Sequence, residues 1–163
     1  MEMSYILLFL LFFFLIFLSE FLAYCWHRWG AHRDIIPHAL GVQKTHEHHH
    51  VTIDDSAYGD FLYILIFLIV YFVLILYLVQ QDIISLTLAF IIYLPLFITS
   101  FYNYFLHSAY HSEDHWLNEY LWFQNDKRIH FQHHRNPETN YGIVSHFSDI
   151  VLDTFDYGLL KEI

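Results

Sequence analysis

The sequence predicts an all-α integral membrane protein, with about three transmembrane helices and a histidine-rich helical cap on the cytoplasmic side. Three observations support this prediction. Of the 163 residues, 56% are hydrophobic and only 15% are charged, and the apolar residues form long runs. The chain contains 14 histidines, all of which lie between or after these runs. All seven lysines and arginines lie there too. A chain of this length is expected to form one domain, residues 1–163.

The first apolar run, residues 5–26, is predicted to be the first transmembrane helix. At 1.5 Å per residue it covers about 33 Å, enough for a hydrocarbon core of about 30 Å. A signal peptide would begin with basic residues and contain a shorter apolar core, whereas this chain places Glu2 before a long run. We therefore expect an uncleaved anchor.

Two further runs, residues 61–79 and 83–106, are predicted to form a transmembrane hairpin because only Gln80–Asp82 connects them. Pro95 is expected to kink the second helix of the hairpin. Three spans place both polar segments, residues 27–60 and 107–163, on one side of the membrane, whereas an even number would separate their histidines. Since all seven basic residues fall in these segments, the positive-inside rule makes that side cytoplasmic. The membrane would be the endoplasmic reticulum in a eukaryote or the inner membrane in a bacterium.

The charge and cysteine content exclude several classes of protein. The formal net charge is −10 with neutral histidine, so a nucleic-acid partner, which needs clustered lysine and arginine, is not expected. Cys25 is the one cysteine, which excludes an internal disulfide framework and a multi-cysteine metal site.

Four groups of histidines are spaced so that each can act as a unit. On a helix, residues i, i+3 and i+4 share one face, so each H-x-x-H-H pattern is expected to aim three imidazoles in one direction. Neutral imidazole binds iron, zinc and copper. A solvated polar run is the alternative for a single such pattern, but four groups at the ends of the spans favour a dimetal site in the cap. The groups are His27 and His32; His46, His49 and His50; His107 and His111; and His130, His133 and His134.

The remaining histidines, His38, His48, His115 and His146, are predicted to orient ligands or to face solvent. His115 is the strongest candidate of the four because it continues the stripe of His107 and His111.

The order of these groups resembles the fatty acid hydroxylase superfamily of membrane di-iron enzymes, which includes sterol desaturases and carotene hydroxylases. Its signature is a histidine pair, an H-x-x-H-H, a hydrophobic hairpin, a second pair and a second H-x-x-H-H. The stretches "SEFLAYCWHR", "HHRNPETNYG" and "DTFDYG" are also similar to the family's, and the resemblance runs from Glu20 to Gly158. Members commonly have four spans or more, so this shorter chain departs from the pattern, which favours oligomerisation.

The resemblance implies an O₂-dependent oxygenase that hydroxylates a lipid in lipid biosynthesis, with two iron ions held by the ten histidines of the four groups. A desaturase of the same superfamily is the alternative, and zinc could replace iron in a preparation. The four residues between His27 and His32 favour an acyl or isoprenoid chain over a sterol ring. Electrons would come from an external donor such as cytochrome b5 or a ferredoxin, because the chain has no flavin or nicotinamide motif.

Several polar residues are candidates to orient the metal ligands. Glu20 lies two helical turns before His27, although a position at the lipid headgroup level is an equal alternative for it. Asn140 is predicted either to orient a ligand or to form a turn. The weaker candidates are Glu47, Asp54, Asp149 and Asp153. The aromatic stretch Trp116–Gln124 is expected to lie in the membrane interface or to form a packed cap helix.

Two functions of other classes compete with the oxygenase. A membrane metal binder or transporter would need ionisable residues within its spans, and the hairpin has only Asp60 and Asp82, at its ends. The second competing function is that of a structural zinc protein or a decayed enzyme. The complete histidine set argues against decay.

Overall fold

The computed structural model describes residues 4–33, 42–52 and 58–158, and every element among them is helical, as predicted. In chain order the elements are α1 (Tyr5–Cys25), the π-helix η1 (Trp26–Ala31), α2 (Val42–Thr52), α3 (Tyr58–Gln80), α4 (Leu86–His111), the 3₁₀ helix η3 (Trp116–Glu119), α5 (Leu121–Arg135) and α6 (Phe147–Val151).

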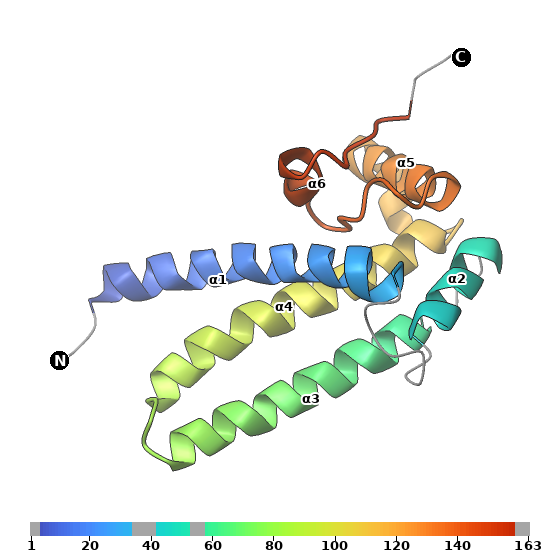
Figure 1. Ribbon diagram of the computed structural model, residues 1–163. Coiled ribbons are helices and arrows are strands. Elements are labelled where there is room, and N and C mark those ends of the chain that lie inside the picture. The colour runs from blue at the N-terminus through green and yellow to red at the C-terminus, as the bar shows by residue number, and fades with distance from the viewer. Residues whose placement is uncertain (1–3, 34–41, 53–57, 159–163) are drawn as a thin grey trace.

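Three long helices form one end of the molecule, and α4 packs against both α1 and α3 (Figure 1). The side chains of Ser4 and Ser85 accept hydrogen bonds from backbone amides in the first turns of α1 and α4, which fixes where these helices begin. Helices α3 and α4 lie side by side and antiparallel, with Asp82 in the left-handed backbone region (φ 54°) in the short turn between them. Helix α4 continues through Pro95 to His111.

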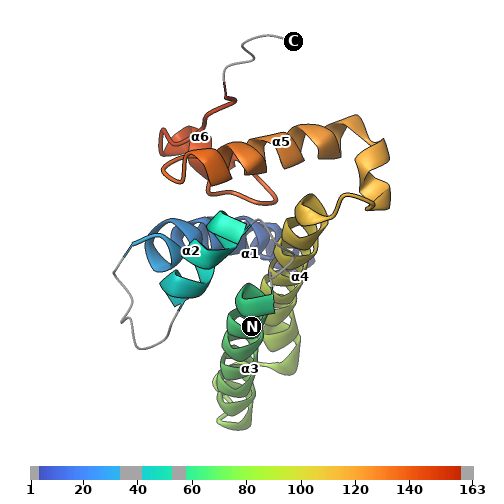
Figure 2. The ribbon, with the colours of Figure 1, turned by 90° about the vertical axis from the view of Figure 1, so that its right-hand side faces the viewer.

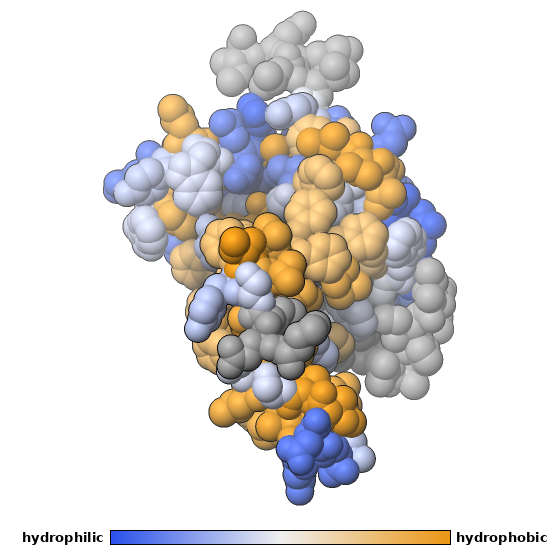
Figure 3. Space-filling model, turned by 90° about the vertical axis from the view of Figure 1, so that its left-hand side faces the viewer, coloured by the Kyte–Doolittle hydropathy of each residue, from blue (hydrophilic) through white to orange (hydrophobic). Residues whose placement is uncertain are grey.

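The long helices present an apolar surface. The stretch Tyr5–Ala31 and helix α4 are each long and apolar enough to cross a membrane, and α3 contributes the shorter apolar stretch Ile64–Gln80. Large apolar side chains of α1, such as Phe9 and Phe14, point outward and are exposed. Hydrophobic surface spreads over these helices in Figure 3, with a hydrophilic tip where the α3–α4 hairpin turns. These features indicate a membrane protein, whereas the count of three spans and the cytoplasmic side stay predictions.

All the histidine groups lie at the other end of the molecule, where α1 and α4 finish. Seen from that end, α2 and the last turns of α4 lie on either side of a common centre and α5 crosses over it (Figure 2). A small core of Leu106, Ala109, Tyr110, Leu117 and Phe123 holds α5 against the end of α4. The chain after α5 returns to α1. There the ring of Phe147 on α6 packs against the ring of Phe17, with the ring centroids 4.8 Å apart.

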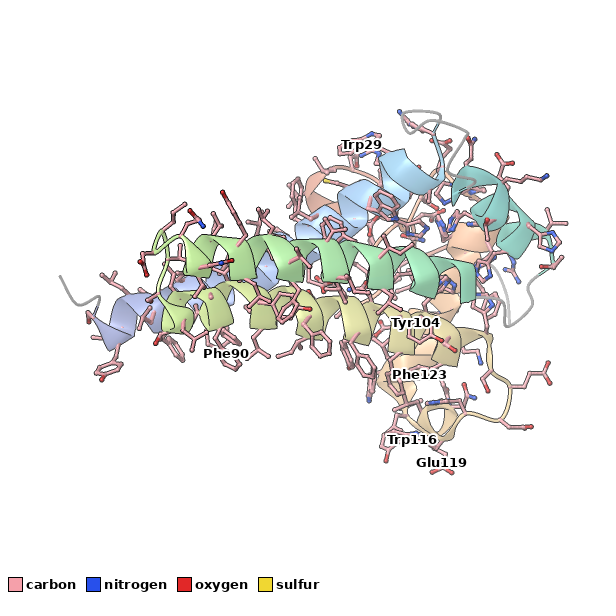
Figure 4. The ribbon with its side chains drawn as sticks, turned by 90° about the horizontal axis from the view of Figure 1, so that it is seen from below. Trp29, Phe90, Tyr104, Trp116, Glu119 and Phe123 are labelled. Atoms are coloured by element: carbon pink, nitrogen blue, oxygen red, sulfur yellow. The ribbon has the colours of Figure 1, made fainter. Side chains whose placement is uncertain are left out.

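The aromatic stretch Trp116–Gln124 forms η3 and the first turn of α5, so it belongs to the cap. Phe123 is fully buried in the small core, whereas Trp116 is 60% exposed and Leu121 is 77% exposed. The packed cap helix therefore describes Phe123, whereas a place in the membrane interface stays a prediction for Trp116 (both labelled in Figure 4).

Candidate metal centre

The structure brings the ten histidines of the four predicted groups together into two clusters of five. Within each cluster the ring nitrogens that could bind a metal all lie within 4.8 Å of one another. Both clusters consist of histidine alone among the described residues. We call them site A, formed by His27, His32, His46, His50 and His133, and site B, formed by His49, His107, His111, His130 and His134.

Each H-x-x-H-H pattern is divided between the two sites, which corrects the expectation that its three imidazoles point in one direction. On α2, His46 and His50 belong to site A while His49 belongs to site B. On α5, His130 and His134 belong to site B and His133 to site A. Residues i+3 and i+4 of an α-helix point about 100° apart, so helices that run between two centres present one histidine to each side. The two sites are thus built alike: a histidine pair, an i, i+4 pair from one pattern and a single histidine from the other.

The pair His27 and His32 depends on the π-helical turn η1. In a regular α-helix, residues five apart point about 140° away from each other. The i→i+5 hydrogen bonding of a π-helix brings such residues to the same side. Because Trp26–Ala31 is π-helical, the two Nε2 atoms approach to 3.3 Å. The five-residue spacing that the sequence shows is therefore matched by the local backbone.

The nitrogen atoms of site A are too close together for hydrogen bonds alone to explain. Nε2 of His32 lies 3.3 Å from that of His27 and 2.9 Å from that of His46, and the latter two are 3.1 Å apart. A neutral imidazole nitrogen has either one proton or one lone pair, so three nitrogens in a triangle cannot all be hydrogen-bonded to each other. A shared cation at the centre would satisfy all three lone pairs.

The spacing also fits a single ion in each site. Nitrogen ligands about 2.1 Å from one ion and at right angles lie about 3.0 Å apart, and opposite ligands lie about 4.2 Å apart. In site B, Nε2 of His130 lies 2.9 Å from that of His111 and 3.0 Å from that of His134, and all five nitrogens fall within 4.8 Å. The residues present therefore fit one transition-metal ion in each site.

The two sites are neighbours. The rings of His50 and His134, one from each site, stack with their centroids 4.3 Å apart. His49 and His50 are adjacent in the chain and belong to different sites. The two sites are therefore in direct contact through their imidazoles.

Burial keeps the imidazoles in the form that binds a metal. The pKa of His46, His130 and His133 lies well below the usual histidine value, first because burial penalises the charged ring and then because neighbouring histidines would repel it. The same causes lower the pKa of His134 to about 2. These rings are neutral at physiological pH, so each has a lone pair for a metal.

Two site A histidines are oriented by backbone carbonyls of one loop. Nδ1 of His27 donates to the Tyr141 carbonyl, and Nδ1 of His133 donates to the Thr139 carbonyl, both at 2.6 Å. A protonated Nδ1 leaves the Nε2 lone pair facing the centre of the site, which is how metal-binding histidines are commonly fixed. These two carbonyls flank Asn140.

Asn140 shapes that loop without touching a histidine. It is fully buried, and its backbone lies in the left-handed region (φ 54°), where asparagine is tolerated. Its Nδ2 donates to the Asp156 carbonyl at 2.6 Å, and its Oδ1 accepts from the Asp156 amide at 2.8 Å. The two interpretations from the sequence thus meet: Asn140 forms a turn, and that turn holds the carbonyls on either side of it.

Replacing Asn140 with alanine is expected to lower the free energy of unfolding by about 2–4 kcal/mol, since it removes buried hydrogen bonds and strains a positive φ. Asn140→Gly keeps the backbone conformation and should cost less. Thermal unfolding and metal content of both variants would check this, with site A expected to bind its metal more weakly in Asn140→Ala. Equal effects of the two substitutions would show that the left-handed conformation contributes nothing.

Asp149, a weaker candidate from the sequence, fixes the next part of the same loop. It is fully buried, and its carboxylate accepts hydrogen bonds from the amides of Tyr141 and Gly142 and from the Thr154 hydroxyl, each at 2.8 Å. Burial raises its pKa, and these three hydrogen bonds oppose that rise. At Gly142 an added Cβ would lie 2.2 Å from the Ser145 carbonyl oxygen, so only glycine fits this tight approach.

The other predicted residues lie outside the two sites. His48 is exposed, and His146 lies near Asp126 and Asp149. His115 does not continue the stripe of His107, which is a correction: α4 ends at His111, and His115 instead caps η3 by accepting from the Leu117 amide.

Among the acidic candidates, Glu47 is exposed and accepts from Gln43, and Asp153 is exposed with φ 55°. His38 and Asp54 lie outside the described residues. Glu20 has Asn103 of α4 as its hydrogen-bond partner, at 3.0 Å, and no described histidine bonds to it. Its role in orienting a ligand stays a prediction. Asn103 was not singled out from the sequence, although it lies four residues before His107 and so on the same helical face.

A cavity of about 500 Å³ connects the apolar helices to both sites. Its walls come mainly from α1, η1 and α4, with a smaller part from α3, and include apolar side chains such as Leu22, Phe67 and Leu96. His27 and His46 of site A and His107 of site B line its inner end. Trp29 and Tyr104, which also line it, lie at the cap end of the long helices in Figure 4. An alkyl chain in this cavity would therefore place its carbons against the histidines.

Comparison with known proteins identifies the family. Residues 12–154 match the family model described as fatty acid hydroxylase. Comparisons with curated proteins and with solved structures gave no match. The matched region contains all ten histidines of sites A and B. Because the match covers most of the 163 residues, the chain belongs to the fatty acid hydroxylase family.

Proposed function

We propose that this protein is an O₂-dependent lipid hydroxylase that holds one iron ion in each of its two histidine sites. The observation that supports it most is that an apolar cavity between the long helices is lined by His27, His46 and His107, which belong to the two all-histidine sites. Membership of the fatty acid hydroxylase family agrees with this chemistry. When bound, two irons would supply the O₂ activation that oxidation of an unactivated C–H bond requires.

The residues of the chain would perform three tasks in this reaction. The apolar wall of the cavity would bind an acyl or isoprenoid chain, or a sterol, that enters from the bilayer. Its exclusion of water would protect the reacting carbon and strengthen electrostatic interactions at the sites. The Thr139 and Tyr141 carbonyls would hold the Nδ1 protons of His133 and His27, so that their Nε2 atoms keep facing the ion.

The reaction also needs parts that the chain does not provide. Electrons would come from an external donor of the cytochrome b5 or ferredoxin type, which would approach the cap. We propose that the cap is cytoplasmic and that the protein forms a homo-oligomer.

The expected result is that the purified, iron-loaded protein carries about two irons per chain and oxidises a lipid only when O₂ and a reductant are present. Mass spectrometry of lipids from cells with and without the protein would check this. A product heavier by one oxygen indicates hydroxylation, and loss of two hydrogens indicates desaturation. An unchanged lipid profile from cells that hold the iron-loaded protein and a working donor would overturn the proposal.

A further inference from the structure

A polar pair faces the cavity from within the apolar helices. Glu20 of α1 and Asn103 of α4 both line it, and Nδ2 of Asn103 donates to Oε1 of Glu20 at 3.0 Å. A carboxyl group inside a membrane span is costly and commonly marks a functional site. Ser19 and Ser100 line the same cavity, so this part of the wall differs from the apolar remainder.

The hydrogen bonds of the pair leave two oxygen atoms for a ligand. The Asn103 amide has two N–H donors, and they go to Glu20 Oε1 and to the Thr99 carbonyl at 2.9 Å. Oδ1 of Asn103 and Oε2 of Glu20 make no hydrogen bond within the described part of the chain. An amide oxygen can only accept, so the ligand group that meets Asn103 Oδ1 must be a donor.

The positions of Glu20 and Asn103 along their helices determine how far they lie from the metal sites. Glu20 on α1 precedes His27 on η1 by seven residues, which is about 10 Å of helix axis. Asn103 precedes His107 by four residues along α4, about 6 Å. A lipid bound to the pair through a polar group would therefore present a carbon several bonds away to the histidines that line the inner end of the cavity.

We propose that Glu20 and Asn103 bind a hydroxyl group of the lipid substrate and so determine which carbon lies against the metal sites. This inference rests on the proposed function, because it names the class of substrate for the same cavity. A hydroxyl group donates to Asn103 Oδ1 or Glu20 Oε2 and is small enough to leave the alkyl chain in the apolar part. A role only in joining α1 to α4 would not require both residues to line the cavity.

Binding of three alkyl probes of equal length tests the proposal without any turnover. Tritiated 1-hexadecanol, bound to the detergent-solubilised, iron-loaded full chain, is displaced by unlabelled 1-hexadecanol, 1-methoxyhexadecane or hexadecane. The alcohol can donate a hydrogen bond, the ether can only accept one, and the alkane can do neither. We expect the alcohol to bind about tenfold more tightly than the ether or the alkane, as a hydrogen bond to a buried polar group would give.

Two variants separate recognition from packing. Glu20→Gln keeps the size and can still accept from Asn103, but places an N–H donor where Oε2 was, so the ether should gain affinity and the preference for alcohol should narrow. Glu20→Leu combined with Asn103→Leu removes both acceptors and should reduce alcohol binding to the level of the alkane. Iron content and size-exclusion profile of each variant show whether it has folded.

Equal binding of alcohol and ether by the wild-type protein would overturn the inference, and so would an unchanged ether affinity in folded Glu20→Gln. Neither result affects the proposed function, which the oxidation assay tests separately. Conversely, a protein that prefers the alcohol but oxidises no lipid would support the recognition by the pair and overturn the hydroxylase.

Discussion

Alanine at His133 is expected to remove the metal of site A and to lower lipid oxidation at least a hundredfold, while site B keeps its metal. Its Nε2 lies 3.1 Å from that of His32, and its side chain is fully buried. Loss of a partner that only orients a ligand costs about 10–100-fold in metal affinity or activity, so loss of a ligand itself should cost more. Metal content, measured by elemental analysis, should fall from about two ions per chain towards one.

Alanine at His49 should remove the metal of site B and lower lipid oxidation to the same extent, while site A keeps its metal. His49 lies one residue from His50 but belongs to site B, with its Nε2 3.0 Å from that of His107. The matched control is His48→Ala on the same helix, because His48 is exposed and belongs to neither site. This control should keep both metals and full activity. Retained turnover in His133→Ala or His49→Ala would contradict the assignment.

Double substitutions test the division of the histidines into two sites. His50→Ala combined with His133→Ala removes two ligands of site A, so one metal should remain. His49→Ala combined with His133→Ala removes one ligand from each site, so both metals should be lost. If each H-x-x-H-H instead bound one metal, both double variants would remove one ligand from each ion, so the two variants would lose metal alike.

The spacing of the histidines was sufficient to select the ten that converge, but not to assign them to sites. Which side of α2 or α5 a histidine faces depends on where these helices lie relative to the ends of α1 and α4, and this is a tertiary property. The π-helical turn at Trp26–Ala31 also could not be predicted from α-helical periodicity. The sequence showed that His27 and His32 are paired, and only the backbone shows how.

The groups that support the histidines were harder to predict because they act through the main chain. A carbonyl such as that of Thr139 carries no residue-specific signal, so sequence patterns pass over it. His115 illustrates the opposite error: periodicity extended α4 beyond His111, whereas Ser112, with extended backbone dihedrals, ends the helix there. Polar residues that meet across helices, such as Glu20 and Asn103, become visible only when the helices are packed.

Asp149→Asn is expected to destabilise the cap and to weaken metal binding at site A. The carboxylate accepts from the amides of Tyr141 and Gly142 with different oxygens, so an asparagine must place an N–H₂ group against one of these donors. Losing hydrogen bonds to a buried carboxylate and creating a donor–donor contact should lower the free energy of unfolding by about 2–4 kcal/mol.

This damage should reach site A through the backbone. The Tyr141 amide bonds to Asp149, while the carbonyl of the same residue accepts from Nδ1 of His27, so a shift of Tyr141 turns that imidazole away from the other ligands. Asp153→Asn is the matched control, because Asp153 is exposed and asparagine suits its positive φ. Melting temperature and metal content should both fall for Asp149→Asn and stay unchanged for Asp153→Asn. A fall in melting temperature with both metals fully bound would mean that Asp149 stabilises the cap without holding the His27 side chain in place.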